Sequence, residues 1–234
     1  ATARVSVTDG SGRVVFASTV PLHLRSADDM FWGKQFHNAE FIASWVMPHD
    51  PHVEQVLSQA KNYMPGKRMP GYEEGKGPLA EERSTWLEAK AIYQALQHEG
   101  VAYVKSSATL GGHQDWSERV RTPGESIQQD SANCIDGAVL YASLFENLGM
   151  EPVIVLVPGH AYVGVRKARD SEDVLYIETA LTGRAPFESA IAAAQRELAK
   201  YSPAQTIRVP ILTARHNGIY PMPIPATTKD AITR

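Results

Sequence analysis

A helical pattern followed by three strand-like segments constrains the second half of this chain most strongly. Apolar residues recur at helical spacing over residues 134–148, and Gly149 stands where it would end the helix. The run 153–157 is apolar and rich in β-branched residues, which is typical of a buried strand. Two alternating segments follow, 160–165 and 174–179, and the polar stretch between them predicts an antiparallel hairpin. A helix beside an antiparallel sheet indicates an α+β fold.

The alternation in this hairpin predicts which side chains share a face. Pairing Val163 with Leu175 collects the apolar residues on one face and places His160 opposite Glu178. A shift by two residues keeps His160 and Glu178 on one face as diagonal neighbours, whereas a shift by one would expose apolar side chains on both faces. Directly opposed residues have Cβ atoms roughly 4.5–5.5 Å apart, so the carboxylate of Glu178 would be within reach of the imidazole.

The single cysteine, Cys134, lies in or just before the first turn of the predicted helix. Backbone N–H groups lack partners within the helix there, and the positive end of the helix dipole favours a thiolate. Taken singly, Cys134 also fits a small buried residue, His160 a structural histidine and Glu178 a solvated strand residue. Their joint arrangement predicts a triad in which Cys134 attacks a carbonyl, His160 transfers the proton and Glu178 orients the imidazole.

The same residues carry a resemblance to a known family. Four segments carry it, namely 133–137, the helix end 146–149, 158–162 and 176–179. They resemble the core of the transglutaminase-like superfamily, and more narrowly its bacterial members, most strongly from residue 119 to residue 183. The resemblance implies a papain-like α+β core in which helices pack on an antiparallel sheet. It also implies that Cys134 is the nucleophile, that His160 is the general base and that Glu178 occupies the acid position, where many members carry aspartate.

The expected reaction is acyl transfer from a peptide or amide carbonyl. Cys134 would form a thioester that water hydrolyses or an amine converts into a crosslink. Hydrolysis is favoured, because keeping water away from a thioester requires a specialised closed site. A second oxyanion donor is needed beside the cysteine N–H, and Gln128 or Asn133 could supply it, although both also fit loop or capping residues. The alternative is a non-catalytic transglutaminase-like module that binds a peptide or a partner protein.

The N-terminal region predicts a small β-hairpin. Segments 3–9 and 13–21 alternate as strands do around an Asp-Gly-Ser-Gly link, and the pair is too short for an independent domain. We therefore expect a hairpin extension over residues 1–26 and a core over residues 27–234 that ends in an extended tail. Further elements are expected in the core: a short strand or buried turn at 41–47, a helix opened by Asp50 and Pro51, a helix over 79–97, a strand at 101–104, an irregular stretch over 106–131, a helix over 187–200 and a strand at 209–212.

Composition and spacing argue against several other classes. A net charge of -3 over 234 residues gives no bulk attraction to nucleic acid, and no apolar stretch is long enough to span a bilayer. The histidines and the single cysteine lack zinc-ligand spacing, and no glycine-rich phosphate loop follows a strand. We expect a peptide or protein substrate and no cofactor or metal. If a signal peptide preceded Ala1, the protein would be periplasmic or secreted, and otherwise cytoplasmic; the oligomeric state is left open.

Overall fold

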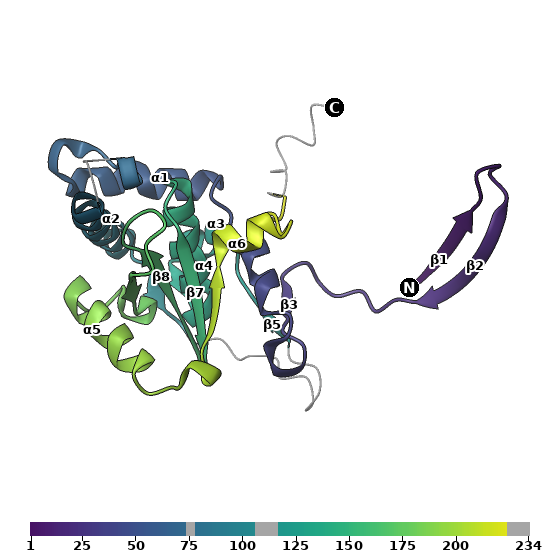
Figure 1. The fold of residues 1–234 in the computed structure, drawn as a ribbon. Coiled ribbons are helices and arrows are strands. Elements are labelled where there is room, and N and C mark those ends of the chain that lie inside the picture. The colour runs from purple at the N-terminus through teal and green to yellow at the C-terminus, as the bar shows by residue number, and fades with distance from the viewer. Residues whose placement is uncertain (74–77, 106–116, 224–234) are drawn as a thin grey trace.

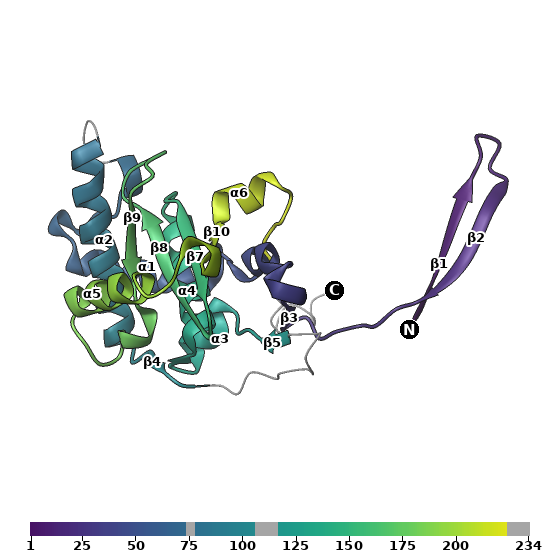
Figure 2. The same ribbon diagram turned by 60° about the horizontal axis from the view of Figure 1, so that its bottom comes forward.

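The computed structural model describes residues 1–73, 78–105 and 117–223 and has an α+β fold. Its central sheet is antiparallel and has the strand order β10-β7-β8-β9 (Figures 1 and 2). These strands are β7 (Pro152–Val157), β8 (His160–Arg166), β9 (Val174–Ile177) and β10 (Ile207–Pro210). The segments predicted as a buried strand and a following hairpin thus form three adjacent strands of one sheet.

Helices cover both faces of this sheet (Figures 1 and 2). They are α1 (Pro51–Ala60), α2 (Pro78–His98), α3 (Pro123–Gln128), α4 (Cys134–Asn147), α5 (Phe187–Leu198) and α6 (Ile211–His216). The central helix α4 packs directly on β7 and β8, and α1 and α3 pack on α4 from its other side. The helix α5 packs on β9. Because both faces are covered, every residue of β7 is buried, which explains its continuous apolar sequence.

Two clusters of apolar side chains fill the space on the two faces. The inner cluster joins the sheet to α4 and the helices behind it, and includes Leu140, Leu144, Ile154, Val163 and Ile177. The outer cluster lies between the sheet and α5, and includes Val155, Val157, Tyr162 and Ala194. Alternate residues of β8 therefore point to opposite layers, which places His160 on the same face as Tyr162.

Local sequence signals explain where several helices begin. The Asp50 side chain accepts a hydrogen bond from the His52 N–H and Pro51 is the first helical residue, so the predicted start of α1 is confirmed. The helices predicted over 79–97 and 187–200 correspond to α2 and α5.

The structure decides between two alternatives at one segment and corrects two other expectations. Residues Ala39–Trp45 form a buried 3₁₀ helix rather than a strand, in keeping with the buried-turn alternative. The helix α3 interrupts the stretch predicted as irregular, because Thr122 and Glu125 form a capping box at its start. The strand predicted at 209–212 ends at Pro210, and Ile211 begins α6.

Short strands complete the fold. The N-terminal hairpin is confirmed as β1 (Thr2–Thr8) paired antiparallel with β2 (Val14–Pro21), and both views place it apart from the helices and the central sheet (Figures 1 and 2). Two further pairs are β3 (Asp29–Phe31) with β5 (Ser117–Arg119), antiparallel, and β4 (Ala102–Tyr103) with β6 (Ser131–Ala132), parallel. The division of the chain at residue 26 stays a prediction, and the tail beyond residue 223 lies outside the described residues.

Within the described residues, no helix combines the length and apolarity that crossing a membrane requires.

Candidate active site

Cys134 is the first residue of α4, as the sequence predicts. A capping box fixes this end of the helix: the Asn133 side-chain oxygen accepts from the Asp136 N–H at 2.8 Å, and the Asp136 carboxylate accepts from the Asn133 N–H at 3.1 Å. Asp136 also accepts from the Arg121 guanidinium at 2.8 Å, so its buried charge is paired. Cys134 packs against the core and remains partly exposed.

A tight turn between β7 and β8 determines the position of His160. Pro158 and Gly159 form a two-residue connection, with Val157 paired to His160, and Gly159 adopts a φ of 74° that favours glycine. His160 is therefore the first residue of β8, at the end of the sheet next to the turn. Its side chain is 23% exposed.

The structure brings His160 and Glu178 together, although the predicted register is wrong by two residues. Val163 pairs with Ile177 rather than with Leu175, so His160 and Glu178 share a face as diagonal neighbours. His160 Nε2 nevertheless lies 2.7 Å from a carboxylate oxygen of Glu178. The prediction that His160 and Glu178 share a face is confirmed. The prediction that they lie directly opposite each other is wrong, because they make contact as diagonal neighbours.

A glycine accounts for the observed register. Gly164 lies opposite Tyr176, and a Cβ built on Gly164 would lie 3.0 Å from the Tyr176 ring and 2.5 Å from Val174. The missing side chain therefore makes room for the Tyr176 ring on the sheet surface. Alternation alone carries no such information, because it is the same after a shift of two residues.

The end of β9 allows the diagonal contact. The strand stops at Ile177, and Glu178 caps the 3₁₀ helix Thr179–Leu181, where its second carboxylate oxygen accepts from the Ala180 N–H at 3.1 Å. This turn also packs against α4: a Cβ on Gly137 would lie 2.8 Å from the Thr179 hydroxyl oxygen. The small residue one turn after Cys134 thus lets the segment that carries Glu178 approach the helix that carries the thiol.

The imidazole of His160 interacts with both other members of the predicted triad. Burial by itself would lower the pKa of His160, but hydrogen bonds to Cys134 and Glu178, together with their negative charges, raise it to about 10. Because Nε2 is held by Glu178, Nδ1 is the nitrogen available to Cys134. A charged imidazole at neutral pH is the partner that a thiolate requires.

The two residues predicted as oxyanion donors have other contacts. Gln128 Nε2 lies 2.8 Å from His52 Nε2, and His52 Nδ1 lies 2.9 Å from Asp50, so this amide joins α3 to α1. No contact in the described part of the chain joins Gln128 to the triad. The Asn133 oxygen caps α4, and its amide donates to Glu118 at 3.5 Å. An oxyanion role for either side chain stays a prediction.

Sequence reasoning missed Tyr103 and Glu118, which interact electrostatically with the predicted triad or with each other. The pKa of the Tyr103 hydroxyl is raised by burial and then by the negative charges of Cys134, Glu178 and Glu118, whereas the charge of Arg184 lowers it. Tyr103 is adjacent to Ala132 in the parallel pair β4–β6, which leads directly to Cys134. No local sequence signal predicts a parallel pair as short as β4–β6.

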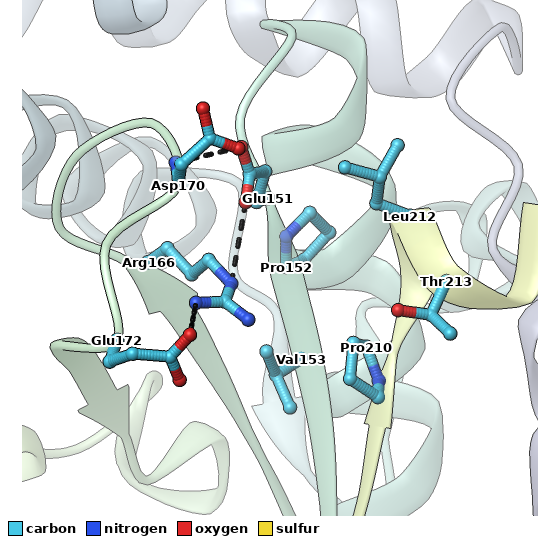
Figure 3. A pocket seen from close by; sticks show the side chains of 9 residues that line it. All are labelled: Glu151, Pro152, Val153, Arg166, Asp170, Glu172, Pro210, Leu212 and Thr213. Atoms are coloured by element: carbon cyan, nitrogen blue, oxygen red, sulfur yellow. Dashed lines mark hydrogen bonds and ion pairs between the residues drawn. The ribbon is translucent and has the colours of Figure 1, made fainter.

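The hollow shown in Figure 3 lies elsewhere. It has a volume of about 180 Å³ and is lined by Glu151, Pro152, Val153, Arg166, Asp170, Glu172, Pro210, Leu212 and Thr213. Arg166 is the last residue of β8, at the opposite end of the strand from His160, and its guanidinium pairs with Glu151 and Glu172 at 3.3 Å each. None of the three residues of the predicted triad lines this hollow.

Comparisons of the chain with protein-family models, with curated proteins and with solved structures find no match. Over the described ranges, no group of three or more His, Cys, Asp or Glu side chains is arranged to hold a metal ion. The interpretation of the site therefore depends on the geometry of Cys134, His160 and Glu178.

Proposed function

We propose that this chain is a thiol-dependent acyl-transfer enzyme with a papain-like, transglutaminase-like core, acting on peptide or amide carbonyls through Cys134, His160 and Glu178. One observation carries the proposal. The only cysteine and the Glu178 carboxylate both raise the pKa of the His160 imidazole, and that carboxylate lies 2.7 Å from His160 Nε2; the three residues come from a helix start, a strand start and the turn that follows a strand.

The reaction follows from these contacts. The Cys134 sulfur attacks the carbonyl carbon, and the carbon–oxygen double bond opens to an oxyanion. The imidazolium of His160 then gives its Nδ1 proton to the departing amine as the carbon–nitrogen bond breaks, which leaves a thioester on Cys134. A water molecule next gives a proton to His160 and attacks the thioester, so that a carboxylic acid leaves and the thiolate–imidazolium pair returns.

The start of α4 supplies an oxyanion donor. The first backbone N–H groups of a helix have no partner within it. The capping box accepts from the N–H groups of Asn133 and Asp136, and so leaves the Cys134 N–H beside its own sulfur. A backbone N–H at this position can stabilise the oxyanion that forms during attack by the sulfur.

Exposure of the site favours hydrolysis over crosslinking. His160 is 23% exposed, and Cys134 is partly exposed. Water can therefore reach a thioester on Cys134 unless a bound acceptor displaces it.

Alkylation of Cys134 by iodoacetamide across pH 5 to 9 tests the proposal. The chain has no other cysteine, so the mass increase of the intact protein reports on this sulfur alone. We expect rapid labelling at pH 6 in the native protein and slow labelling at pH 6 in the His160→Gln variant. Labelling that rises with pH as in an ordinary thiol, with no effect of His160→Gln, would contradict the proposal and favour a non-catalytic module that binds a peptide or a partner protein.

A further inference from the structure

Glu118 is an acidic residue beside the nucleophile that the proposed reaction does not use. It lies in β5 opposite Met30 of β3. Side chains alternate along a strand, so Glu118 points away from the face of its neighbour Arg119. Arg119 accordingly pairs with Asp28 at 2.7 Å and with Glu125 at 3.4 Å.

The Glu118 carboxylate receives hydrogen bonds but has no cationic partner among the described residues. The Trp32 side chain donates to it, and the Asn133 amide donates at 3.5 Å. The other two acids near Cys134 differ, because Asp136 pairs with Arg121 and Glu178 pairs with His160. Burial, followed by the charge of Asp136, raises the pKa of Glu118 to about 7. The fold therefore holds this acid group in an environment that disfavours its charge, which is a common property of functional sites.

Tyr103 and Asn133 both connect Glu118 with the start of α4. The charges of Cys134, Glu178 and Glu118 all raise the pKa of Tyr103, and the charge of Arg184 lowers it, so all four groups lie within electrostatic reach of this hydroxyl. Tyr103 is 40% exposed, so this part of the site faces solvent. Asn133, whose amide donates to Glu118, directly precedes Cys134 in the chain.

We infer that Glu118 is a specificity-determining residue that binds the cationic side chain of a lysine or arginine in the peptide whose carbonyl Cys134 attacks. This inference rests on the proposed function. A bound ammonium or guanidinium group would supply the missing positive charge, together with donors for the partly desolvated carboxylate. A neutral side chain would leave the carboxylate without a countercharge, and an acidic one would be repelled.

Irreversible peptide probes test the inference without knowledge of the natural substrate. Three peptidyl acyloxymethyl ketones, identical except for lysine, norleucine or glutamate at the residue that carries the ketone, are reacted with the full chain. The rate of Cys134 alkylation is measured by intact mass. Each rate is divided by the iodoacetamide rate of the same variant at the same pH, which removes general changes in thiol reactivity.

We expect the lysine probe to react at least about tenfold faster than the norleucine probe in the native protein, and the glutamate probe to react slowest. Glu118→Gln should abolish the preference for lysine. Glu172→Gln is the matched control, because it removes a negative charge from a side chain that is 94% exposed at the far end of β8, and it should keep the preference.

The outcomes separate this inference from the proposed function. Equal rates for lysine and norleucine in the native protein, or a preference that survives Glu118→Gln, would overturn the role of Glu118 even if iodoacetamide labels Cys134 rapidly at pH 6. Slow iodoacetamide labelling at pH 6 would instead contradict the proposed function itself.

Discussion

Replacing Glu178 by glutamine should lower the reactivity of the Cys134 thiol, because His160 Nε2 would change from a hydrogen-bond donor to an acceptor. One oxygen of Glu178 accepts from the Ala180 N–H at 3.1 Å and the other contacts His160 Nε2 at 2.7 Å. A glutamine has a single oxygen, and if this oxygen keeps the Ala180 contact, the amide N–H₂ faces Nε2. Nε2 must then accept, so the imidazole carries its proton on Nδ1, toward Cys134, and gains no anionic partner.

The magnitude follows from the environment of His160. The pKa of His160 rises from 6.5 to about 10 against the effect of burial, through contacts with Cys134 and Glu178. That rise corresponds to roughly 5 kcal/mol in favour of the imidazolium, at about 1.4 kcal/mol for each tenfold change. If Glu178 contributes about half, its loss costs roughly 2–3 kcal/mol, or about 30- to 150-fold in the population of the thiolate–imidazolium pair.

The assay is the rate of Cys134 alkylation by iodoacetamide at pH 6 and at pH 9.5. We expect Glu178→Gln to react about 30- to 150-fold more slowly than the native protein at pH 6. It should approach the native rate at pH 9.5, where an unassisted thiol is also ionised. Glu178→Asp is the matched control, since it keeps the charge with a shorter reach and should lose less. If a folded Glu178→Gln protein kept the native ratio of the alkylation rate at pH 6 to the rate at pH 9.5, this account of the triad would be refuted.

Three further predictions concern stability. The fold raises the pKa of Glu118 from 4.5 to about 7 and so favours the protonated acid, which means that this residue lowers the free energy of unfolding increasingly as pH rises from 4.5 to 7. Glu118→Gln should therefore be more stable than the native protein at pH 8, by about 1–3 kcal/mol in urea titrations, and the gain should vanish at pH 4; an equal gain at both pH values would contradict this reasoning. Gly137→Ala should cost about 1–3 kcal/mol and slow alkylation at pH 6, because the added methyl group would lie 2.8 Å from the Thr179 oxygen and displace Glu178; native alkylation kinetics would disprove the proposed link. Arg215→Met should cost about 2–4 kcal/mol in urea titrations, since the guanidinium pairs with both oxygens of Glu146 and donates to the carbonyls of Ala43, Val46 and Ile219; a loss below about 1 kcal/mol would show that these contacts are replaceable.

Local signals in the sequence predict where the helices near the candidate site begin. The Asp50-Pro51 pair predicts the start of α1, and the apolar spacing that ends at Gly149 predicts α4 with Cys134 at its first turn. Alternation in the hairpin correctly places His160 and Glu178 on one face. These features depend only on neighbouring residues and on the period of each element, so the amino-acid sequence is sufficient to predict them.

Features that depend on contacts between distant segments could not be predicted in this way. The register of β8 and β9 depends on the fit of the Tyr176 ring over Gly164, and alternation does not distinguish registers two residues apart. Glu118 belongs to a three-residue strand whose partner, β3, lies far away in the chain. The start of α3 is predictable in principle, because Thr122 and Glu125 have the spacing of a capping box, but the adjacent Pro123 and Gly124 are also typical of a loop.

The two-residue turn at Pro158 and Gly159 makes chain length, as well as residue identity, a requirement of this site. A one-residue insertion in the turn that shifted the pairing of β8 by one residue would rotate His160 to the opposite face of the sheet, away from Glu178. A deletion of one residue would have the same consequence. Substitutions at the turn that respect the positive φ of Gly159 should therefore be tolerated better than any change in the number of residues there.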